Sequence, residues 1–244
     1  MESQTLIFDL DDTLVHCNKY FKNAVDEFVE QIQEWFDHLS KEEIRKRQIE
    51  IDIKSVKEHG LHSSRFPESL ATTYMSFCTE CDRNNEKEKL QIVKNIGKSV
   101  FQIEVQPFPD MYDVLNTLKD EGHSMYLFTG GDEPNQNRKI MQLELEEYFK
   151  NNVYIFEHKN ADALRKVIEE IKITPKSTWM IGNSLRTDIQ PAIDLEINAI
   201  HIPSDIEWAY NKKNLEIETE FKGKFIELKS LKDLPNYIRG HANR

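Results

Sequence analysis

Acidic side chains gather directly after the first apolar segment of the chain. Residues 5–8 form a short strand-prone run, and Asp9, Asp11 and Asp12 follow it at once. In an extended chain, Asp9 and Asp11 point to the same side because they lie two positions apart. Two carboxylates held close together raise each other's pKa unless a cation lies between them. This spacing therefore predicts a site for a cation or for acid–base chemistry.

Three later apolar segments also end in polar or small residues. The run at 125–128 leads into Thr129 and Gly130, the run at 153–156 precedes Lys159, and the run at 179–181 leads into Gly182 and Asn183, with Asp188 close behind. In an open parallel sheet the carboxyl ends of the strands share one edge, where ligands bind. The sequence therefore predicts one site assembled from four strand ends.

The oxygen atoms in this set are suited to a magnesium ion and a phosphate. Asp9, Asn183 and Asp188 offer hard oxygen ligands, which Mg²⁺ prefers together with water and phosphate. Asp9, kept ionised beside a metal, can attack phosphorus. Asp11, if kept protonated, can donate a proton to the leaving oxygen and later accept one from water. The acidic residues therefore favour phosphoryl transfer.

Donors for a phosphoryl group come from the other strand ends. The Thr129 hydroxyl, the Gly130 N–H and the Lys159 ammonium are the groups that a transferring phosphoryl needs. Each is ordinary when taken alone, since a Thr-Gly-Gly sequence can be a plain turn and most lysines are solvated. Four such segments in order, each at the end of a predicted strand, favour a catalytic site over four unrelated turns.

The surrounding pattern divides the chain into two kinds of segment. Residues 16–105 carry apolar residues at helical spacing without a strand signal, which predicts an all-helical module. Residues 1–15 and 106–244 alternate strands with helices, as in a parallel sheet with helices on both faces. The predicted fold is thus an α/β, Rossmann-like core at 1–15 and 106–244, interrupted by a helical insertion at 16–105.

These segments resemble the motifs of the haloacid dehalogenase superfamily of phosphotransferases. Residues 8–14 are similar to its DxDxT/V motif, 127–130 to its second motif, Lys159 to the lysine of its third, and 182–188 to its fourth, GDxxxxD. The resemblance covers residues 1–15 and about 106–240. It therefore extends over the predicted core and leaves out the helical insertion.

The resemblance implies roles for individual residues. Asp9 would be the phosphoaspartyl nucleophile, and Asp11 the general acid/base that also gives Mg²⁺ its backbone carbonyl. Asp188 would hold the metal directly or through water, and the insertion would be a helical cap that closes over the substrate. The chain departs from the fourth motif at Asn183, where the family usually has Asp. An amide offers an oxygen but no charge, so weaker Mg²⁺ binding is expected.

Composition excludes several other functional classes. The net charge of −11 and the pI of about 5.3 describe a surface that repels nucleic acids and anionic membranes. No apolar run approaches the roughly 20 residues of a membrane-spanning helix. The three cysteines and an N-terminus without a basic segment predict a soluble cytoplasmic protein. Cys78 and Cys81 form a CxxC, but a second pair of zinc ligands is missing.

The sequence predicts a Mg²⁺-dependent phosphatase that acts on a small phosphorylated metabolite through a phosphoaspartyl intermediate on Asp9. A 2-haloacid dehalogenase or a phosphomutase of the same superfamily, or a non-catalytic phospho-switch or binding protein, remain alternatives. Dehalogenation needs no acid at Asp11, and the long insertion together with Asn183 and Asp188 disfavours a receiver-like switch. No sequence signal specifies the substrate, the cap residues that select it, or the oligomeric state.

Overall fold

The computed structural model describes residues 2–242, and the chain divides into two compact units. The core unit comprises Met1–Asn18 and Val105–Arg244, and the inserted unit comprises Lys19–Glu104. Among the described residues, all strands belong to the core unit, and the regular structure of the inserted unit is helical. The site predicted from the sequence therefore has to be sought in the core unit.

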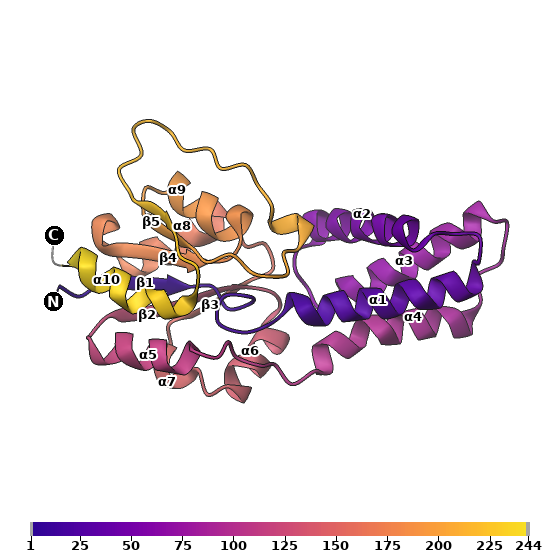
Figure 1. Ribbon diagram of the computed structural model, residues 1–244, viewed down its shortest axis with the longest axis horizontal. Helices are drawn as coiled ribbons and strands as arrows, with labels where there is room; N and C mark the ends of the chain where they lie inside the picture. Colours follow the sequence, from indigo (N-terminus) through magenta and orange to yellow (C-terminus); the bar gives the residue numbers. More distant parts are fainter. Residues whose placement is uncertain (1, 243–244) are drawn as a thin grey trace. The chain divides into compact units, whose positions relative to one another are not determined.

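A parallel sheet of six strands forms the centre of the core unit (Figure 1). The strands are β1 (Thr5–Phe8), β2 (Ser124–Gly130), β3 (Val153–Phe156), β4 (Thr178–Gly182), β5 (Asn198–His201) and β6 (Phe225–Glu227). Their order across the sheet is β3-β2-β1-β4-β5-β6, and every neighbouring pair is parallel. Because β1 lies between β2 and β4 and is covered on both faces, its sequence is almost continuously apolar.

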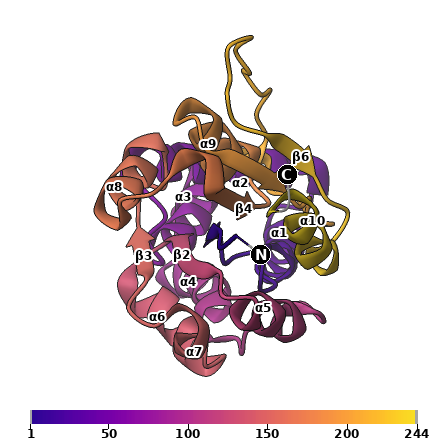
Figure 2. The ribbon, with the colours of Figure 1, turned by 90° about the vertical axis from the view of Figure 1, so that its left-hand side faces the viewer.

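Helices cover both faces of this sheet (Figure 2). One face carries α5 (Met111–Asp120), α6 (Glu133–Gln142), α7 (Glu146–Phe149) and α10 (Leu234–Ala242), and the other carries α8 (Ala161–Ile171) and α9 (Gln190–Asp194). Successive strand residues point to opposite faces, so Leu6 and Phe8 pack with the first group whereas Ile7 packs with the second. The prediction of a parallel α/β sheet with helices on both faces is confirmed.

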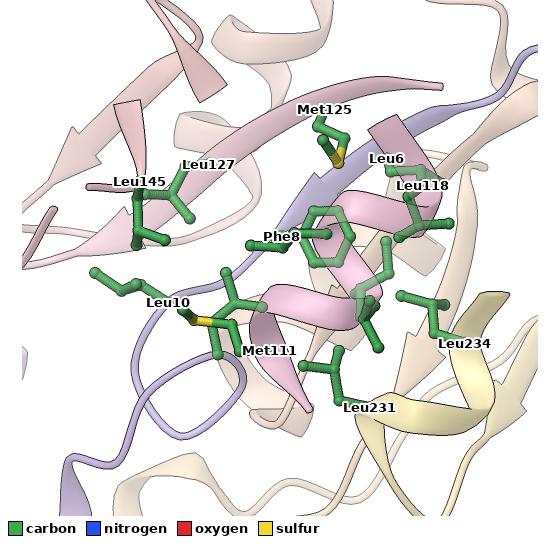
Figure 3. Packing of buried hydrophobic residues seen from close by; sticks show 14 of the residues in the cluster. Leu6, Phe8, Leu10, Met111, Leu118, Met125, Leu127, Leu145, Leu231 and Leu234 are labelled. Atoms are coloured by element: carbon green, nitrogen blue, oxygen red, sulfur yellow. The ribbon is translucent and has the colours of Figure 1, made fainter. Parts of the chain in front are cut away.

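The apolar layer beneath α5 surrounds the end of β1 (Figure 3). Phe8 lies among Met111 and Leu118 of α5 and Leu234 of α10, and all four side chains are fully buried. Burial of one such side chain contributes roughly 1.5–3 kcal/mol. This packing therefore fixes the end of β1 and, with it, the position of Asp9, the next residue.

Two short segments that flank the insertion pair with each other inside the core unit. His16 N–H donates to Gln106 O and Phe108 N–H donates to Leu14 O, both at 2.9 Å. The rings of His16 and Phe108 lie with their centroids 4.1 Å apart. The chain therefore leaves the core and re-enters it at neighbouring positions.

The inserted unit is built from four long helices. They are α1 (Asn18–Trp35), which starts at the last residue of the first core segment, α2 (Lys41–His59), α3 (Arg65–Glu80) and α4 (Lys87–Ser99). The Ser40 side chain caps α2, and Gly60, with φ of 78°, ends it. At Gly97 a Cβ atom would lie 2.6 Å from Pro67 Cα, so glycine permits α4 to approach α3. Within residues 2–242, no helix is both long and apolar enough to cross a membrane.

Asp52 is a buried carboxylate between α2 and α3. It is 7 % exposed and accepts a hydrogen bond from Ser69 Oγ at 2.9 Å. Burial raises the pKa of Asp52 to about 6, because the hydrogen bond from Ser69 offsets only part of the lost hydration. The folded-state pKa exceeds the unfolded value of about 3.9. Asp52 therefore lowers stability progressively as the pH rises from about 4 to about 6, and the full loss persists above that range.

We expect Asp52→Asn to remove this pH-dependent loss, which amounts to about 3 kcal/mol for a shift of about two pKa units. Urea unfolding of the full chain at about pH 4 and about pH 7 measures it as a change in the stability difference between variant and wild type. Asp37→Asn is the matched control because the Asp37 side chain is 97 % exposed, and it should follow the wild type at both values. A pH-independent difference for Asp52→Asn would show that Asp52 ionises normally.

Candidate active site

Lys159 contacts two buried carboxylates at the carboxyl ends of the strands. Its Nζ lies 2.5 Å from Asp9 Oδ1 and 2.5 Å from Asp188 Oδ1. The other oxygen of Asp9 accepts a hydrogen bond from Thr13 Oγ1 at 2.9 Å. These four residues, which we call the Asp9 cluster, are each 5 % exposed or less. The cluster therefore holds two carboxyl groups and one ammonium where little water can reach them.

The Asp9 cluster has two carboxyl groups for one ammonium. Burial raises the pKa of Asp9 to about 7, and the nearby Asp188 adds to the rise while Lys159 opposes it. Burial also lowers the pKa of Lys159, but the two carboxylates overcome this effect and the net shift is upward. Lys159 therefore stays an ammonium, and a further positive charge at this point would stabilise both carboxylates.

Asp188 is placed by a tight turn after β4. Leu185–Ile189 form one π-helical turn, a feature that often occurs at functional sites. Ser184 binds this turn twice: its Oγ accepts from Thr187 N–H at 3.1 Å, and its own N–H donates to Asp188 Oδ2 at 2.9 Å. Gly182 provides the space, since a Cβ there would lie 2.2 Å from Asp188 Oδ2. The side chain of Asp188 can therefore take this position only because residue 182 is a glycine.

A second ion pair holds Asp11. Lys139 Nζ lies 2.7 and 2.8 Å from its two oxygens, and Gln136 Nε2 donates to Asp11 Oδ2 at 3.0 Å. Gln136 Nε2 also lies 2.5 Å from Thr129 Oγ1 and 2.9 Å from Gly130 O. Burial raises the pKa of Asp11, but Lys139 and Gln136 more than offset this, so the pKa lies below its ordinary value. Asp11 is therefore a carboxylate. We call Asp11, Lys139, Gln136, Thr129 and Gly130 the Asp11 cluster.

Asn183 follows β4 and is 4 % exposed. Its backbone oxygen lies 3.0 Å from His201 Nε2, and His201 Nδ1 in turn lies 2.9 Å from Glu227 Oε2. Asn183 Nδ2 is buried and has no hydrogen-bond partner within the described residues. Buried polar groups are nearly always hydrogen-bonded. The strand end therefore combines a backbone fixed by β5 and β6 with an unsatisfied side-chain amide.

The oxygen donors at these strand ends fit Mg²⁺. The carboxyl groups of Asp9 and Asp188 meet at one ammonium, and the Asn183 amide oxygen and the Asp11 backbone oxygen are of the hard type that Mg²⁺ prefers. Over residues 2–242, no group of three or more His, Cys, Asp or Glu side chains is placed to hold a metal ion. The carboxylate of Asp11 contacts Lys139 instead, so Asp9 and Asp188 provide the two acidic side chains of the donor set.

The structure brings the predicted residues into two adjoining groups. Asp9, Lys159 and Asp188 are in direct contact, Asp11, Thr129 and Gly130 are joined through Gln136, and Asn183 lies buried at the end of β4 without a hydrogen bond from Nδ2. The lysine at the first group is Lys159, whereas Lys150 and Lys166, which lie near it in the sequence, are exposed.

Three residues of the site were not anticipated from the sequence. Gln136, Lys139 and His201 are polar or charged, and such residues are exposed in most proteins. The spacing of Gln136 and Lys139 places them on one face of α6, shortly after Gly130, which ends β2, and Gly131. This spacing is the only signal that could have indicated them, and it does not distinguish a buried face from a solvated one.

One known family matches most of the chain. The family described as haloacid dehalogenase-like hydrolase matches residues 4–195. The match covers more than half of the chain, and the chain therefore belongs to the haloacid dehalogenase-like hydrolase family. The predicted family resemblance is thus confirmed.

Individual relatives match nearly the whole chain, one in sequence and two in fold. The glyceraldehyde 3-phosphate phosphatase of Pyrococcus furiosus is 24% identical over 229 residues, covering 90% of this chain and 85% of the relative. A haloacid dehalogenase-like hydrolase from Xanthomonas campestris superposes with a TM-score of 0.75 at 19% identity, over 99% of this chain and 96% of the other. The L-2-haloacid dehalogenase of Xanthobacter autotrophicus gives a TM-score of 0.60 at 14% identity, over 98% and 99%.

We expect Gly182→Ala to displace Asp188 and to destabilise the core unit by about 1–3 kcal/mol, because the added methyl overlaps a side chain fixed by Ser184. Gly240→Ala is the matched control, since a Cβ at that exposed helix position meets no atom within 4 Å. Denaturant unfolding of both variants measures the effect. Equal stability of the two variants would contradict a steric role for Gly182.

Proposed function

We propose that the protein is a Mg²⁺-dependent phosphatase that hydrolyses a small phosphomonoester through a phosphoaspartyl intermediate on Asp9. The observation that carries this proposal is the Asp9 cluster. Asp9 lies at the end of a buried strand, Thr13 and Lys159 each hold one of its oxygens, and Asp188 adds a second carboxylate. A carboxylate fixed in this way and shielded from water is suited to nucleophilic attack on phosphorus.

In the first step, a carboxylate oxygen of Asp9 forms a bond to phosphorus as the bond from phosphorus to the substrate oxygen breaks. Asp11 is ionised beside Lys139, so it first takes up a proton from solvent and then gives this proton to the leaving oxygen. Thr129, Gly130 and Lys159 are the proposed donors to the phosphoryl oxygens.

In the second step, water attacks the phosphorus of the phosphoaspartate. Asp11 accepts the proton of this water, the bond between phosphorus and the Asp9 oxygen breaks, and inorganic phosphate leaves. The carboxylate form of Asp11 held by Lys139 is the form that this step requires. Asp11 then releases this proton to solvent and returns to the carboxylate beside Lys139, so the proton taken up before the first step is given back after the second.

The residues that would hold Mg²⁺ are Asp9 and Asp188 with their side chains, Asp11 with its backbone oxygen, and Asn183 with its amide oxygen. When bound, the ion supplies positive charge beside the nucleophile and the phosphoryl oxygens. The two carboxyl groups of the Asp9 cluster, which share a single ammonium, support this assignment.

The substrate class is proposed by analogy with the Pyrococcus furiosus relative, whose name specifies a small phosphorylated aldehyde. The net charge of −11 also disfavours nucleic acid and anionic membranes as partners. We further propose residues 1–15 and 106–244 as the catalytic core, the helical segment 16–105 as a cap that selects the substrate, and the cytoplasm as the location.

A second candidate is hydrolysis of a carbon–halogen bond, which the similarity in fold to the Xanthobacter autotrophicus enzyme brings into consideration. That reaction also needs a carboxylate nucleophile, but it needs no proton at the leaving atom. The buried Lys139–Asp11 pair is unexplained by such a reaction. Release of phosphate or of halide from small test substrates distinguishes the two, and return of the phosphoryl group to substrate would indicate a mutase.

We expect Asp9→Asn to abolish phosphate release from an aryl phosphate while the fold is retained, because an amide cannot form the phosphoenzyme. Circular dichroism checks the fold, and beryllium fluoride should bind the wild type but not the variant. Asp120→Asn is the matched control, since Asp120 lies exposed at the end of α5. Turnover by Asp9→Asn near the wild-type level, with contaminating wild type excluded, would overturn the assignment.

We expect Asn183→Asp to tighten Mg²⁺ binding by roughly tenfold, because a carboxylate adds a full charge close to a divalent ion. Asp188→Asn should weaken it by at least a similar factor. Titration of activity with Mg²⁺, together with calorimetric binding, measures both changes. If Asn183→Asp leaves the affinity unchanged while Asp188→Asn abolishes binding, Asn183 is not a metal ligand.

A further inference from the structure

Two buried side chains of α6 lie outside the motifs that define the family. Gln136 is 0 % exposed and Lys139 is 6 % exposed, and both contact Asp11. We propose that Lys139 and Gln136 are positioning residues: Lys139 orients the Asp11 carboxylate for proton transfer, and Gln136 orients the Thr129 hydroxyl toward the phosphoryl group. This inference rests on the phosphatase function proposed above.

The contact with Lys139 fixes the direction of the Asp11 side chain. One ammonium binds both carboxylate oxygens, at 2.7 and 2.8 Å, so rotation of the carboxylate would break two contacts at once. Burying a lysine is unfavourable unless its charge is compensated. Lys159 compensates Asp9 and Asp188, whereas Lys139 compensates Asp11. Asp9 and Asp11 of the first motif therefore each have a separate buried lysine.

The contact with Gln136 acts on Thr129. Gln136 Nε2 has two hydrogens, and its three acceptors within 3.0 Å are Asp11 Oδ2, Thr129 Oγ1 and Gly130 O. Because the Thr129 oxygen accepts from this amide, its own hydrogen is left to point elsewhere. A hydroxyl held in this state is a donor, which is what a phosphoryl oxygen at the strand end requires.

The backbone before α6 is shaped around Gln136. Gly131 has φ of 144°, and a Cβ at that position would lie 2.9 Å from Gln136 Cγ and 3.0 Å from its Cδ. Asp132 Oδ1 then accepts the N–H of Asn135 at 3.0 Å and fixes the start of the helix. The second glycine after Thr129 therefore makes room for Gln136.

The test is a double-mutant cycle on the full chain. Lys139→Met should lower kcat for an alkyl phosphate by roughly 10–100-fold with little change in KM. In an Asp11→Asn background, the same change should lower kcat by less than about threefold, because a residue that acts through Asp11 has no further effect once Asp11 is disabled. Lys166→Met, at an exposed helix position, is the control and should retain wild-type kinetics.

Gln136→Leu tests the second contact. It should raise KM and the inhibition constant for orthovanadate by roughly 10-fold while kcat falls less, because the Thr129 donor is no longer oriented. Gln136→Leu also keeps the inference testable if Lys139→Met does not fold, since it removes no charge. Melting temperatures of all variants identify any that are unfolded.

The outcomes distinguish failure of the positioning roles from failure of the proposed phosphatase function. Independent losses for Lys139→Met and Asp11→Asn, or a Gln136→Leu variant with unchanged KM and orthovanadate inhibition, would overturn the positioning roles and leave the phosphatase intact. Absence of phosphate release by the wild type from every phosphate ester, with no trapping at Asp9, would overturn both proposals. Non-additive losses with the split between kcat and KM would support the inference.

Discussion

Two buried carboxylates that share one ammonium impose the strictest demand on this structure. Removing the charges of Asp9, Asp188 and Lys159 from water is costly unless their geometry is held closely. Thr13, the backbone of Ser184 and the layer beneath α5 all serve that geometry. The apolar strands and the polar turns behind them therefore form one system, in which packing at the centre fixes charges at the edge.

The order of the strands explains why the lysine has to be long. Lys159 follows β3, which is separated from β1 by β2, yet its ammonium contacts Asp9 at the end of β1. The side chain therefore has to pass the end of β2, and its Nζ lies 5.0 Å from the centroid of the Phe128 ring of that strand. A long apolar stem with a charged end can make this crossing without leaving a polar group unsatisfied along the way.

The parts of the site that the sequence predicts are those fixed by strand ends. Asp9 and Asp188 follow apolar runs, and parallel topology alone brings such positions to one edge. Gln136 and Lys139 could not be predicted in this way, because their burial depends on how α6 lies against the end of β2. His201 lies at a strand end too, but its role depends on a contact with a backbone oxygen, which no pattern of side chains reveals.

The paired segments beside the insertion bear on the entropy of closing residues 19–104 into a loop and on the length that this loop can have. Leu14 and His16 bind Phe108 and Gln106, so both ends of residues 19–104 are anchored at one place in the core. The entropy of closing a loop grows only slowly with its length. Because the ends of this segment are already joined, a change in its length should alter the entropy of closure only slightly. The pairing of β1 with β2 and β4 does not depend on that length. The junction therefore carries the constraint on the ends of the insertion, and the residues between those ends are free of it.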